Sequence, residues 1–308
     1  MNKLMVLGSV NADHVLQVPF FPRPGETLMG RNYQVIAGGK GANQAVAAAR
    51  LGADIGFVAS VGDDAFGLNI IDAFKADGIN TDFISITPNT PTGIAMIQVS
   101  DAGENSICLA PEANNALTTP LVETHAQAIQ QSQYLLLQLE TPLEGIETAV
   151  KLAKQDSHNP VQVILNPAPA KALPESLLSQ VDIITPNETE AEILTGIEVV
   201  DDATAQQAAA ALHAKGIAIV MITLGSKGVW LSEQGQGQII PGFRVKATDT
   251  TAAGDTFNGA FVTGLLDGMS TQEAIRFAHA AAAISVTRFG AQTSIPTRQE
   301  VDSFLQDQ

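Results

Sequence analysis

Cysteine, positive charge and long apolar runs are all scarce in this 308-residue chain. Its one cysteine, Cys108, cannot form an internal disulfide. No apolar run reaches the roughly 18 residues that a membrane span needs, and no charged leader precedes an apolar stretch of signal length. We therefore expect a soluble, cytoplasmic protein without a membrane partner.

Basic residues are outnumbered by acidic ones, with 16 Lys and Arg against 32 Asp and Glu. The formal net charge of −16 argues against nucleic acid or an anionic membrane as a partner, because like charges repel. A protein of this charge that binds a polyphosphate must neutralise it locally, through a metal ion, a few basic groups and backbone amides.

Charged residues of both signs make up only 16% of the chain, whereas apolar residues make up 45%. This composition predicts a well-buried globular protein without a disordered tail. The length corresponds to about two domains, although one α/β layer fold with a small appendage can also hold this many residues.

Short apolar runs alternate with helical patterns along most of the chain, beginning with a strand at 3–9 and regular from residue 119, where a helix runs to 131. This alternation predicts an α/β fold, with a mostly parallel central sheet between two helical layers, α/β/α. Two strand-rich inserts, at 13–36 and 91–109, interrupt the pattern. In the first insert the chain returns as a strand at 27–36. We expect the two inserts to form a small β-sheet lid over an active site, attached to a large domain of residues 1–12, 37–90 and 110–308. Exposed strand edges on such a lid favour a homodimer.

Ligands of such folds gather at the carboxyl ends of the strands. Six residues are expected just after predicted strands, namely Asn11, Asp13, Glu140, Asn187, Gly225 and Asp255. Asn11 and Asp13 would share one strand face and suit adjacent hydroxyls of a sugar, unless they form a turn. Asn187 and Glu190 could hold the hydration shell of a metal or form a helix cap.

The stretch from Asp249 to Gly259 is where we expect the chemistry. Small residues at 252–254 precede an apolar periodic run, which predicts a tight turn that opens into a helix. Free amides at a helix start suit a phosphate or an anionic oxygen. A carboxylate there repels the phosphate, so Asp255 is expected to accept a proton from an attacking hydroxyl. The alternative is an ordinary helix cap.

A glycine-rich loop at 37–44 also precedes a helix, but it lacks both common nucleotide-loop patterns. A dinucleotide fingerprint needs glycine where Gln44 stands, and a Walker loop needs Ser or Thr where Gly41 stands. Glycines allow a ligand close to the backbone. Lys40 would contact such a ligand or be a solvated surface lysine.

Three segments together, at 38–45, 187–190 and 249–259, resemble the ribokinase-like carbohydrate kinases, and the resemblance covers essentially the whole chain. It implies ATP-dependent phosphorylation of D-ribose at the 5-hydroxyl, supported by Mg²⁺ and by K⁺ as a monovalent activator. The expected partners are ATP and a small sugar.

The resemblance also assigns residues. The catalytic set comprises the base Asp255 and an anion hole at Ala252, Ala253 and Gly254. The sugar set comprises Asn11, Ala12, Asp13, Gly39, Lys40, Gly41, Ala42, Asn43, Glu140 and Asp255. The ATP set comprises Asn187, Thr223, Leu224, Gly225, Ser226, Lys227, Gly228, Gly254, Asp255 and His279. The monovalent-cation set comprises Asp249, Thr251, Ser285, Arg288, Gly290 and Ser294, several through carbonyl oxygens, while Asn187 and Glu190 would organise Mg²⁺ through water.

Several alternatives remain open. Many members of the family have glycine where this chain has Ala252, which we expect to matter little unless φ there is positive. His279, in an alanine-rich run, would otherwise be an ordinary half-buried helix histidine. A kinase for fructose, another small sugar or a nucleoside would use the same 249–259 motif. A sugar-sensing protein without turnover is a further alternative, and a dehydrogenase is disfavoured by Gln44.

Overall fold

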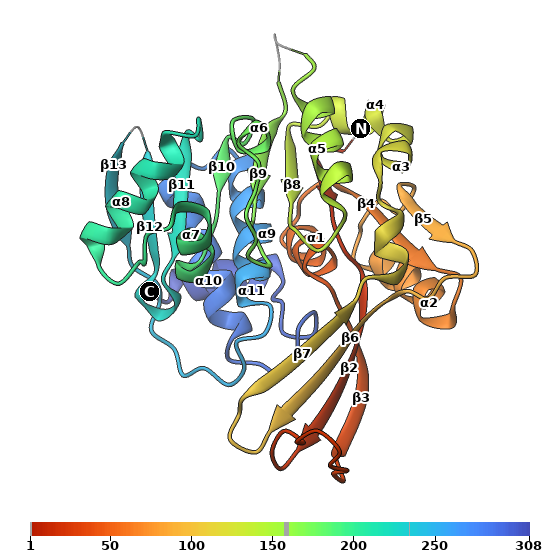
Figure 1. Ribbon diagram of the computed structural model, residues 1–308. Helices are drawn as coiled ribbons and strands as arrows, with labels where there is room; N and C mark the ends of the chain where they lie inside the picture. Colours follow the sequence, from red (N-terminus) through yellow and green to blue (C-terminus); the bar gives the residue numbers. More distant parts are fainter. Residues whose placement is uncertain (1, 157–159, 234) are drawn as a thin grey trace.

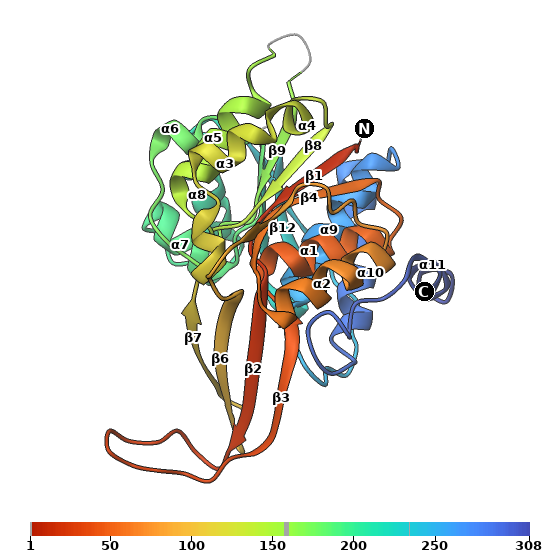
Figure 2. The ribbon, with the colours of Figure 1, turned by 90° about the vertical axis from the view of Figure 1, so that its right-hand side faces the viewer.

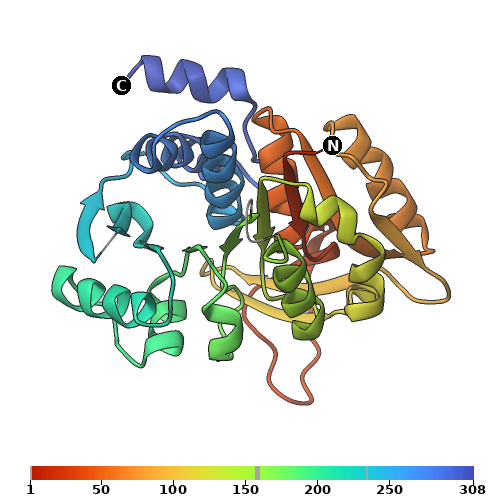
Figure 3. The ribbon, with the colours of Figure 1, turned by 90° about the horizontal axis from the view of Figure 1, so that it is seen from above.

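The chain folds into a sheet covered by helices on both faces, with a smaller sheet projecting from one end (Figure 1). The computed structural model describes residues 2–156, 160–233 and 235–308. Figure 2 shows helices on both sides of the large sheet, and Figure 3 gives the same arrangement from above. The predicted α/β class, with a mostly parallel sheet and a small second sheet, is confirmed.

Within the described residues the large sheet has nine strands, in the order β13-β12-β11-β10-β9-β8-β1-β4-β5. They are β1 (Leu4–Leu7), β4 (Ile55–Gly62), β5 (Ile84–Thr87), β8 (Tyr134–Leu137), β9 (Gln162–Leu165), β10 (Ile183–Ile184), β11 (Ile219–Thr223), β12 (Val229–Glu233) and β13 (Gln236–Ile240). β11, β12 and β13 pair antiparallel at one edge, and the other neighbours pair in parallel. β1 and β4 are buried along their whole length, which fits their largely apolar sequences, with Ser60 of β4 as a buried polar exception.

Each face of the large sheet has its own apolar core and its own helices. One face carries α1 (Lys40–Arg50), α2 (Ala65–Ala76), α9 (Ala253–Leu266), α10 (Thr271–Ser285) and α11 (Arg298–Gln306). The other carries α3 (Thr119–Thr124), α4 (Ala126–Gln130), α5 (Leu143–Ala153), α6 (Glu175–Leu178), α7 (Glu188–Thr195) and α8 (Asp202–His213). Short 3-10 helices are η1 (Glu112–Ala116) and η2 (Gly225–Lys227). Among the residues that the structure describes, none of the helices combines the length and the hydropathy that a membrane span requires.

The small sheet has the order β3-β2-β6-β7 and extends away from the large one (Figure 2). Its strands are β2 (Asn11–Val18), β3 (Arg31–Gly38), β6 (Gly93–Ser100) and β7 (Asn105–Ala110). β2 and β6 are parallel, while β2–β3 and β6–β7 are antiparallel. Gly8 and the two residues after it are all that separates β1 from β2. The small sheet therefore starts at the edge of the large one.

Two elements differ from the sequence expectation. The helix expected over 119–131 is broken at His125, whose ring packs edge-on against Phe83 at 5.7 Å between ring centroids. The His125 amide donates to the Val122 carbonyl three residues back, so the turn tightens there. The strand expected at 27–36 begins only at Arg31, after a proline-containing loop.

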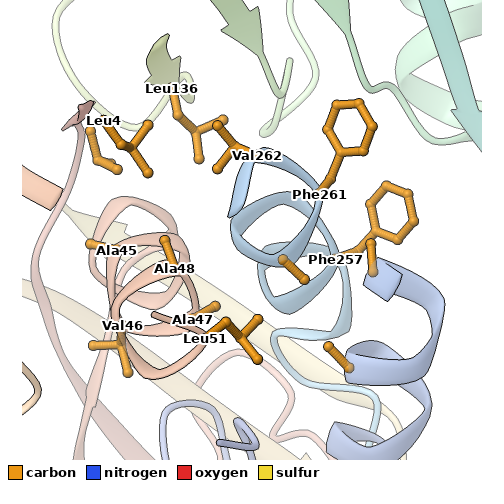
Figure 4. Packing of buried hydrophobic residues seen from close by; sticks show 14 of the residues in the cluster. Leu4, Ala45, Val46, Ala47, Ala48, Leu51, Leu136, Phe257, Phe261 and Val262 are labelled. Carbon is orange, nitrogen blue, oxygen red and sulfur yellow. The ribbon is translucent and has the colours of Figure 1, made fainter. Parts of the chain in front are cut away.

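Helices α1 and α9 pack closely through small residues (Figure 4). Ala47 and Ala48 of α1 face α9, and Phe261 and Val262 belong to the same buried cluster. A Cβ atom added to Gly259 of α9 would lie 2.6 Å from Ala47 Cβ, so only glycine permits this distance between the helices. This packing brings residues near 43 and 255 together although about 210 positions separate them.

Candidate active site

Polar residues gather at the carboxyl edge of the large sheet, as the strand-end rule predicts. Ser9 follows β1, Glu140 follows β8 and Asn187 follows β10. The expectation that Asp255 directly follows a strand is wrong, because residues 241–252 form a loop and Asp255 lies in the first turn of α9. Proline at 241 lacks the amide that would continue the β13 ladder.

Both carboxylate oxygens of Asp255 are held by amides from the start of α1. Asn43 Nδ2 donates to Oδ2 at 2.9 Å, and Gln44 Nε2 donates to Oδ1 at 3.0 Å. Asp255 is 7% exposed, so a small part of it remains accessible at the edge. The structure therefore joins the glycine-rich loop and the 249–259 segment into one site.

Asn11 and Asp13 form the beginning of β2 and are buried, so the strand alternative holds and the turn alternative does not. Asn114 Nδ2 donates to Asn11 Oδ1 at 2.9 Å and fixes that side chain. Asp13 Oδ1 is buried without a partner among the described residues. A Cβ atom added to Gly38 would lie 2.0 Å from Asp13 Oδ2, so this glycine makes room for the carboxylate.

The negative charges of four carboxylates, Asp13, Glu140, Glu190 and Asp255, act on Lys40; we call these four residues the carboxylate cluster. The negative charge of Asp255 raises the pKa of Lys40, burial opposes this, and Glu140 raises it further. Lys40 is thus a partly buried ion, and the solvated-surface alternative does not describe it.

One carboxyl group of this cluster, Asp13, has an unusual pKa, and burial is the main cause. Burial, followed by the charges of Glu140 and Asp255, raises the pKa of Asp13 to about 7, whereas Lys40 lowers it. A buried carboxylate with an unpaired oxygen is costly unless a ligand donates to it. The carboxylate cluster is therefore suited to a ligand that supplies several hydroxyl donors.

Glu140 ties the loop before α1 to the end of β1. Ser9 Oγ donates to Glu140 Oε2 at 2.6 Å, and the Lys40 amide donates to the same oxygen at 3.0 Å. Gly41 lies directly against Gly8, since a Cβ atom at Gly41 would lie 2.5 Å from the Gly8 carbonyl carbon. The glycines of this loop thus let the backbone approach β1 and hold Lys40 in place.

A cavity of about 690 Å³ lies beside the cluster, between η2, the 242–250 loop and the helices α9 and α10; we call it the β11–α9 cavity. Seven residues assigned to the nucleotide line it, namely Thr223, Gly225, Ser226, Lys227, Gly228, Gly254 and His279. The other three, Asn187, Leu224 and Asp255, are not part of its lining, although all three are described. Leu224 packs against the apolar core, and Asn187 bridges to Thr223 at the edge of the cavity.

His279 lies in α10, is 8% exposed and faces the cavity. Burial lowers the pKa of His279 to about 4, so the ring is neutral at pH 7. Its ring lies 5.4 Å from that of Phe257, between centroids. Both ring nitrogens are buried, and the backbone of Pro241 beside the ring partly opposes the lowering of its pKa.

The first turn of α9 presents backbone amides toward the cavity, because Ala253 and Gly254 line it. The Ala253 amide donates to the Thr250 carbonyl at 3.2 Å, so it is not free in this structure. The amides of Ala252 and Gly254 have no acceptor within the described parts of the chain. Ala252 has φ of 58°. Because φ is positive, alanine in place of the glycine that many family members have does matter, and the backbone is strained here.

Asn187 and Glu190 form a capping box at the start of α7. Asn187 Oδ1 accepts from the Glu190 amide at 2.8 Å, and Glu190 Oε2 accepts from the Asn187 amide at 2.9 Å. Asn187 and Glu190 therefore do form the helix cap that was one of the two alternatives for them. Burial raises the pKa of Glu190, and its second oxygen stays out of the capping box.

The residues assigned to a monovalent cation converge from two segments. Asp249 Oδ2 accepts from the Gly290 amide at 2.9 Å, and Asp249 Oδ1 accepts from the Thr251 hydroxyl at 2.7 Å. The hydroxyls of Ser285 and Ser294 are buried and donate to carbonyls of their own turns. The Arg288 guanidinium pairs with Glu300 at 2.6 Å, so only the carbonyl of Arg288 could face an ion.

Sequence reasoning missed several residues of the site. Gln44 was noted only as a mismatch to a motif, yet it contacts Asp255. Asn166 directly follows β9, so the strand-end rule could have found it. Phe243 and Arg244 line the β11–α9 cavity from an irregular loop, and no periodic signal marks them.

Comparisons with known proteins agree with this geometry. The chain is 58% identical over 303 residues, 98% of each chain, to a protein named ribokinase from Haemophilus influenzae. It is 37% identical over 303 residues, again 98% of each, to a deoxyribokinase from Salmonella typhi. A solved structure of Arabidopsis thaliana ribokinase complexed with ribose and ATP superimposes with a TM-score of 0.92 at 35% identity, covering 99% of both chains. The pattern of the pfkB family carbohydrate kinases matches residues 1–298, and the chain therefore belongs to that family.

Proposed function

We propose that this protein phosphorylates D-ribose at the 5-hydroxyl with ATP, giving D-ribose 5-phosphate and ADP. One observation carries the proposal: Asp255 belongs to the carboxylate cluster and accepts a hydrogen bond from Asn43, while its neighbour Gly254 lines the β11–α9 cavity. A proton acceptor thus lies where the two ligands would meet. The similarity to proteins named ribokinase, one of them complexed with ribose and ATP, supports this substrate pair.

In the proposed reaction the 5-hydroxyl oxygen attacks the γ-phosphorus, and the bond from that phosphorus to the β-phosphate bridging oxygen breaks. Asp255 accepts the hydroxyl proton, a contribution worth about 10²–10⁴ in rate. The amides of Ala252 and Gly254, and of Ala253 once it leaves the Thr250 carbonyl, would bind the charge that develops on the transferred group.

The sugar would contact Asn11, Asp13, Lys40, Asn43 and Glu140. Asp13 Oδ1 and Asn43 Oδ1 are buried acceptors without partners in the described chain, and ribose hydroxyls would satisfy them. A sugar that lacks the matching hydroxyl leaves such an acceptor unpaired, at a cost of about 1–3 kcal/mol.

The nucleotide would occupy the β11–α9 cavity. Lys227 and Arg244 supply positive charge there, and Phe257, Val245 and the neutral ring of His279 supply apolar surface for a base. Three independent properties of the cavity, its size, its cations and the amides at the start of α9, are those expected of a site for a nucleoside triphosphate.

The residues near Lys40 fit a magnesium ion held through water. Glu190 keeps one carboxylate oxygen outside its capping box, and Mg²⁺ prefers such oxygens together with water molecules. When bound, Mg²⁺ would neutralise charge on the phosphates. Asn187 and Glu190 are the residues that we expect to hold its hydration shell.

The 249–251 and 285–294 segments fit a monovalent cation such as K⁺. Asp249 supplies the one carboxylate of this set. The hydrogen bond that it accepts from the Gly290 amide brings the two segments together. Because Asp249 lies four positions before Ala253, the first residue of α9, an ion there would steady the turn that presents the amides.

We also propose that the small sheet closes over the sugar and pairs with a second copy of the chain. Met29, Tyr33, Met96 and Ile107 on or next to this sheet are large apolar side chains that are more than half exposed. Such surface favours burial against a partner. Sedimentation at micromolar concentration tests the dimer, and a monomer with full activity would contradict it.

ADP release in the presence of ribose, with and without K⁺ at fixed Mg²⁺, tests the substrate, the reaction and the cation together. Fructose, adenosine and 2-deoxyribose are assayed in parallel, the last because a relative at 37% identity is named deoxyribokinase. We expect ribose to give the highest kcat/KM. Turnover with adenosine but not with free ribose would reject the proposal in favour of a nucleoside kinase, and ribose binding without ADP release would favour a sensor.

A further inference from the structure

A chain of buried side-chain amides reaches Asp255 from the interior of the large domain. Gln138, just after β8, donates from Nε2 to Gln44 Oε1 at 2.6 Å. Gln44 Nε2 donates to Asp255 Oδ1 at 3.0 Å and to Asn166 Oδ1 at 3.0 Å. Gln44 is 0% exposed and Gln138 is 1% exposed, so neither can contact a ligand in the solvent-accessible part of the site.

The carboxylate fixes the direction of every bond in this chain. An ionised Asp255 has no proton to donate, so Gln44 must present its NH₂ group to it. The oxygen of Gln44 then faces away and accepts from Gln138. On the other side, Asn166 uses its NH₂ group for the Thr185 carbonyl at 3.1 Å, so its oxygen faces Gln44. Only one arrangement of these amides satisfies all the donors.

A second branch reaches the backbone of the same turn. The Thr185 hydroxyl donates to Asn258 Oδ1 at 2.7 Å, and Asn258 Nδ2 donates to the Gly254 carbonyl at 2.8 Å. Gly254 and Asp255 are therefore both fixed by groups anchored at the ends of β8, β9 and β10. Burying this many amides in a core is costly unless each is paired, so the network is better explained by positioning than by stability.

We propose that Gln44 is a positioning residue for the base, holding the Asp255 carboxylate at the angle from which it meets the sugar hydroxyl. This inference rests on the proposed kinase activity. Asn43 alone could hold one carboxylate oxygen and still let the group rotate about that contact, whereas two donors on two oxygens fix its plane. The residue that breaks the dinucleotide fingerprint would thus have its own function here.

The test compares Gln44→Met with wild type. Methionine keeps the length and the apolar contacts of glutamine but removes both amide functions. We expect kcat to fall about 10-fold to 100-fold, because a misplacement of about 1 Å can cost this much. KM for ribose and ATP should stay within about threefold.

Thr263→Val is the matched control. Thr263 lies in the same α1–α9 interface, is fully buried and donates to the Gly259 carbonyl at 2.8 Å, but it does not contact Asp255. Its removal should lower the thermal stability while leaving kcat and both KM values unchanged. A control that loses kcat as much as Gln44→Met would assign the effect to the interface and overturn the inference.

Gln138→Met provides a second, milder variant in case Gln44→Met does not fold. It leaves both bonds to Asp255 intact and frees only Gln44 Oε1, so we expect a loss of about threefold to tenfold in kcat, within the range for small misplacement. If neither the folded variants nor their crystal structures show a change, in kcat or in the position of the Asp255 carboxylate, the inference is wrong. An inactive wild type would instead reject the proposed function, and the crystal structure of Gln44→Met would still decide the positioning.

Discussion

The carboxylate cluster and the β11–α9 cavity meet at the first turn of α9, yet their electrostatics are opposite. In the cluster four negative charges act on Lys40, and one of the four carboxyl groups, Asp13, has a pKa raised to about 7, mainly by burial. The cavity is lined by Lys227 and Arg244 and, among the described residues, by no acidic side chain.

The difference shows how a chain with a net charge of −16 could bind a polyanion and a neutral polyol side by side. Buried acceptors of the cluster are costly until hydroxyl donors arrive, which selects the sugar. The cavity instead offers shape, local cations and backbone amides, which suit any similar nucleotide. Discrimination is therefore expected on the cluster side, and the following predictions test that division.

The largest effect is expected for Asp255→Asn, which removes the proton acceptor where the two regions meet. An amide cannot accept the hydroxyl proton, so kcat should fall about 10²–10⁴-fold. Nucleotide affinity, measured by calorimetry, should stay near that of wild type because Asp255 does not line the β11–α9 cavity. Near wild-type kcat in this variant would refute the assignment of the base.

Asp13→Asn should stabilise the ligand-free protein at alkaline pH. Because the folded pKa of Asp13 is raised to about 7, its charged form destabilises the fold, and the associated stability is lost as pH rises through about 7. Asparagine carries no such charge, so the variant should gain stability at pH 8, by at most about 4 kcal/mol, and little at pH 4. Thermal unfolding at both pH values measures this, and an equal gain at both would show that charge is not the cause.

Gly259→Ala should separate the two regions by pushing α9 away from α1. The added methyl group would lie 2.6 Å from Ala47 Cβ and 2.6 Å from the Gln44 carbonyl oxygen. We expect a loss of about 1–3 kcal/mol in unfolding free energy and about tenfold in kcat, because Asn43 and Gln44 move relative to Asp255. Denaturant unfolding and ADP release measure the two effects.

Gly264→Ala on the same helix is the control for that variant. Its added methyl group would face α10, at 3.0 Å from Ala274 Cβ, and not α1. A stability loss without a loss of kcat is expected. Equal losses of kcat in both variants would contradict the proposed link between α1–α9 spacing and turnover.

The smallest effect is expected for Ala252→Gly at the start of α9. Glycine removes a backbone strain of about 1–2 kcal/mol at positive φ. It also raises the entropy of the unfolded chain, which lowers the stability by about 0.4–1 kcal/mol. The melting temperature should therefore rise by only about 1–3 °C, with kcat within about twofold. A tenfold change in kcat would indicate that the Ala252 methyl group itself shapes the anion site.

The strand-end rule and the three motifs carried most of the prediction. The alternation of apolar runs and helical patterns predicted the α/β class and the small sheet, whereas the site residues around Asp255 came from the resemblance that the motifs carry. The rule was wrong for Asp255 itself, because residues 241–252 form a loop that has no periodic pattern. It also left Asn166 unnoticed although that residue directly follows β9.

By itself the sequence determined the α/β class, a mostly parallel large sheet with a small second sheet, and the edge that carries polar groups, because these follow from the order of apolar runs and helical patterns. Only the tertiary structure decided that Gln44 donates to Asp255, that the charges of four carboxylates act on Lys40 and that Ala252 has positive φ. Contacts between residues about 210 positions apart depend on the packing distance of α1 and α9. That distance is set by Gly259 against Ala47, a steric fit that no local pattern encodes.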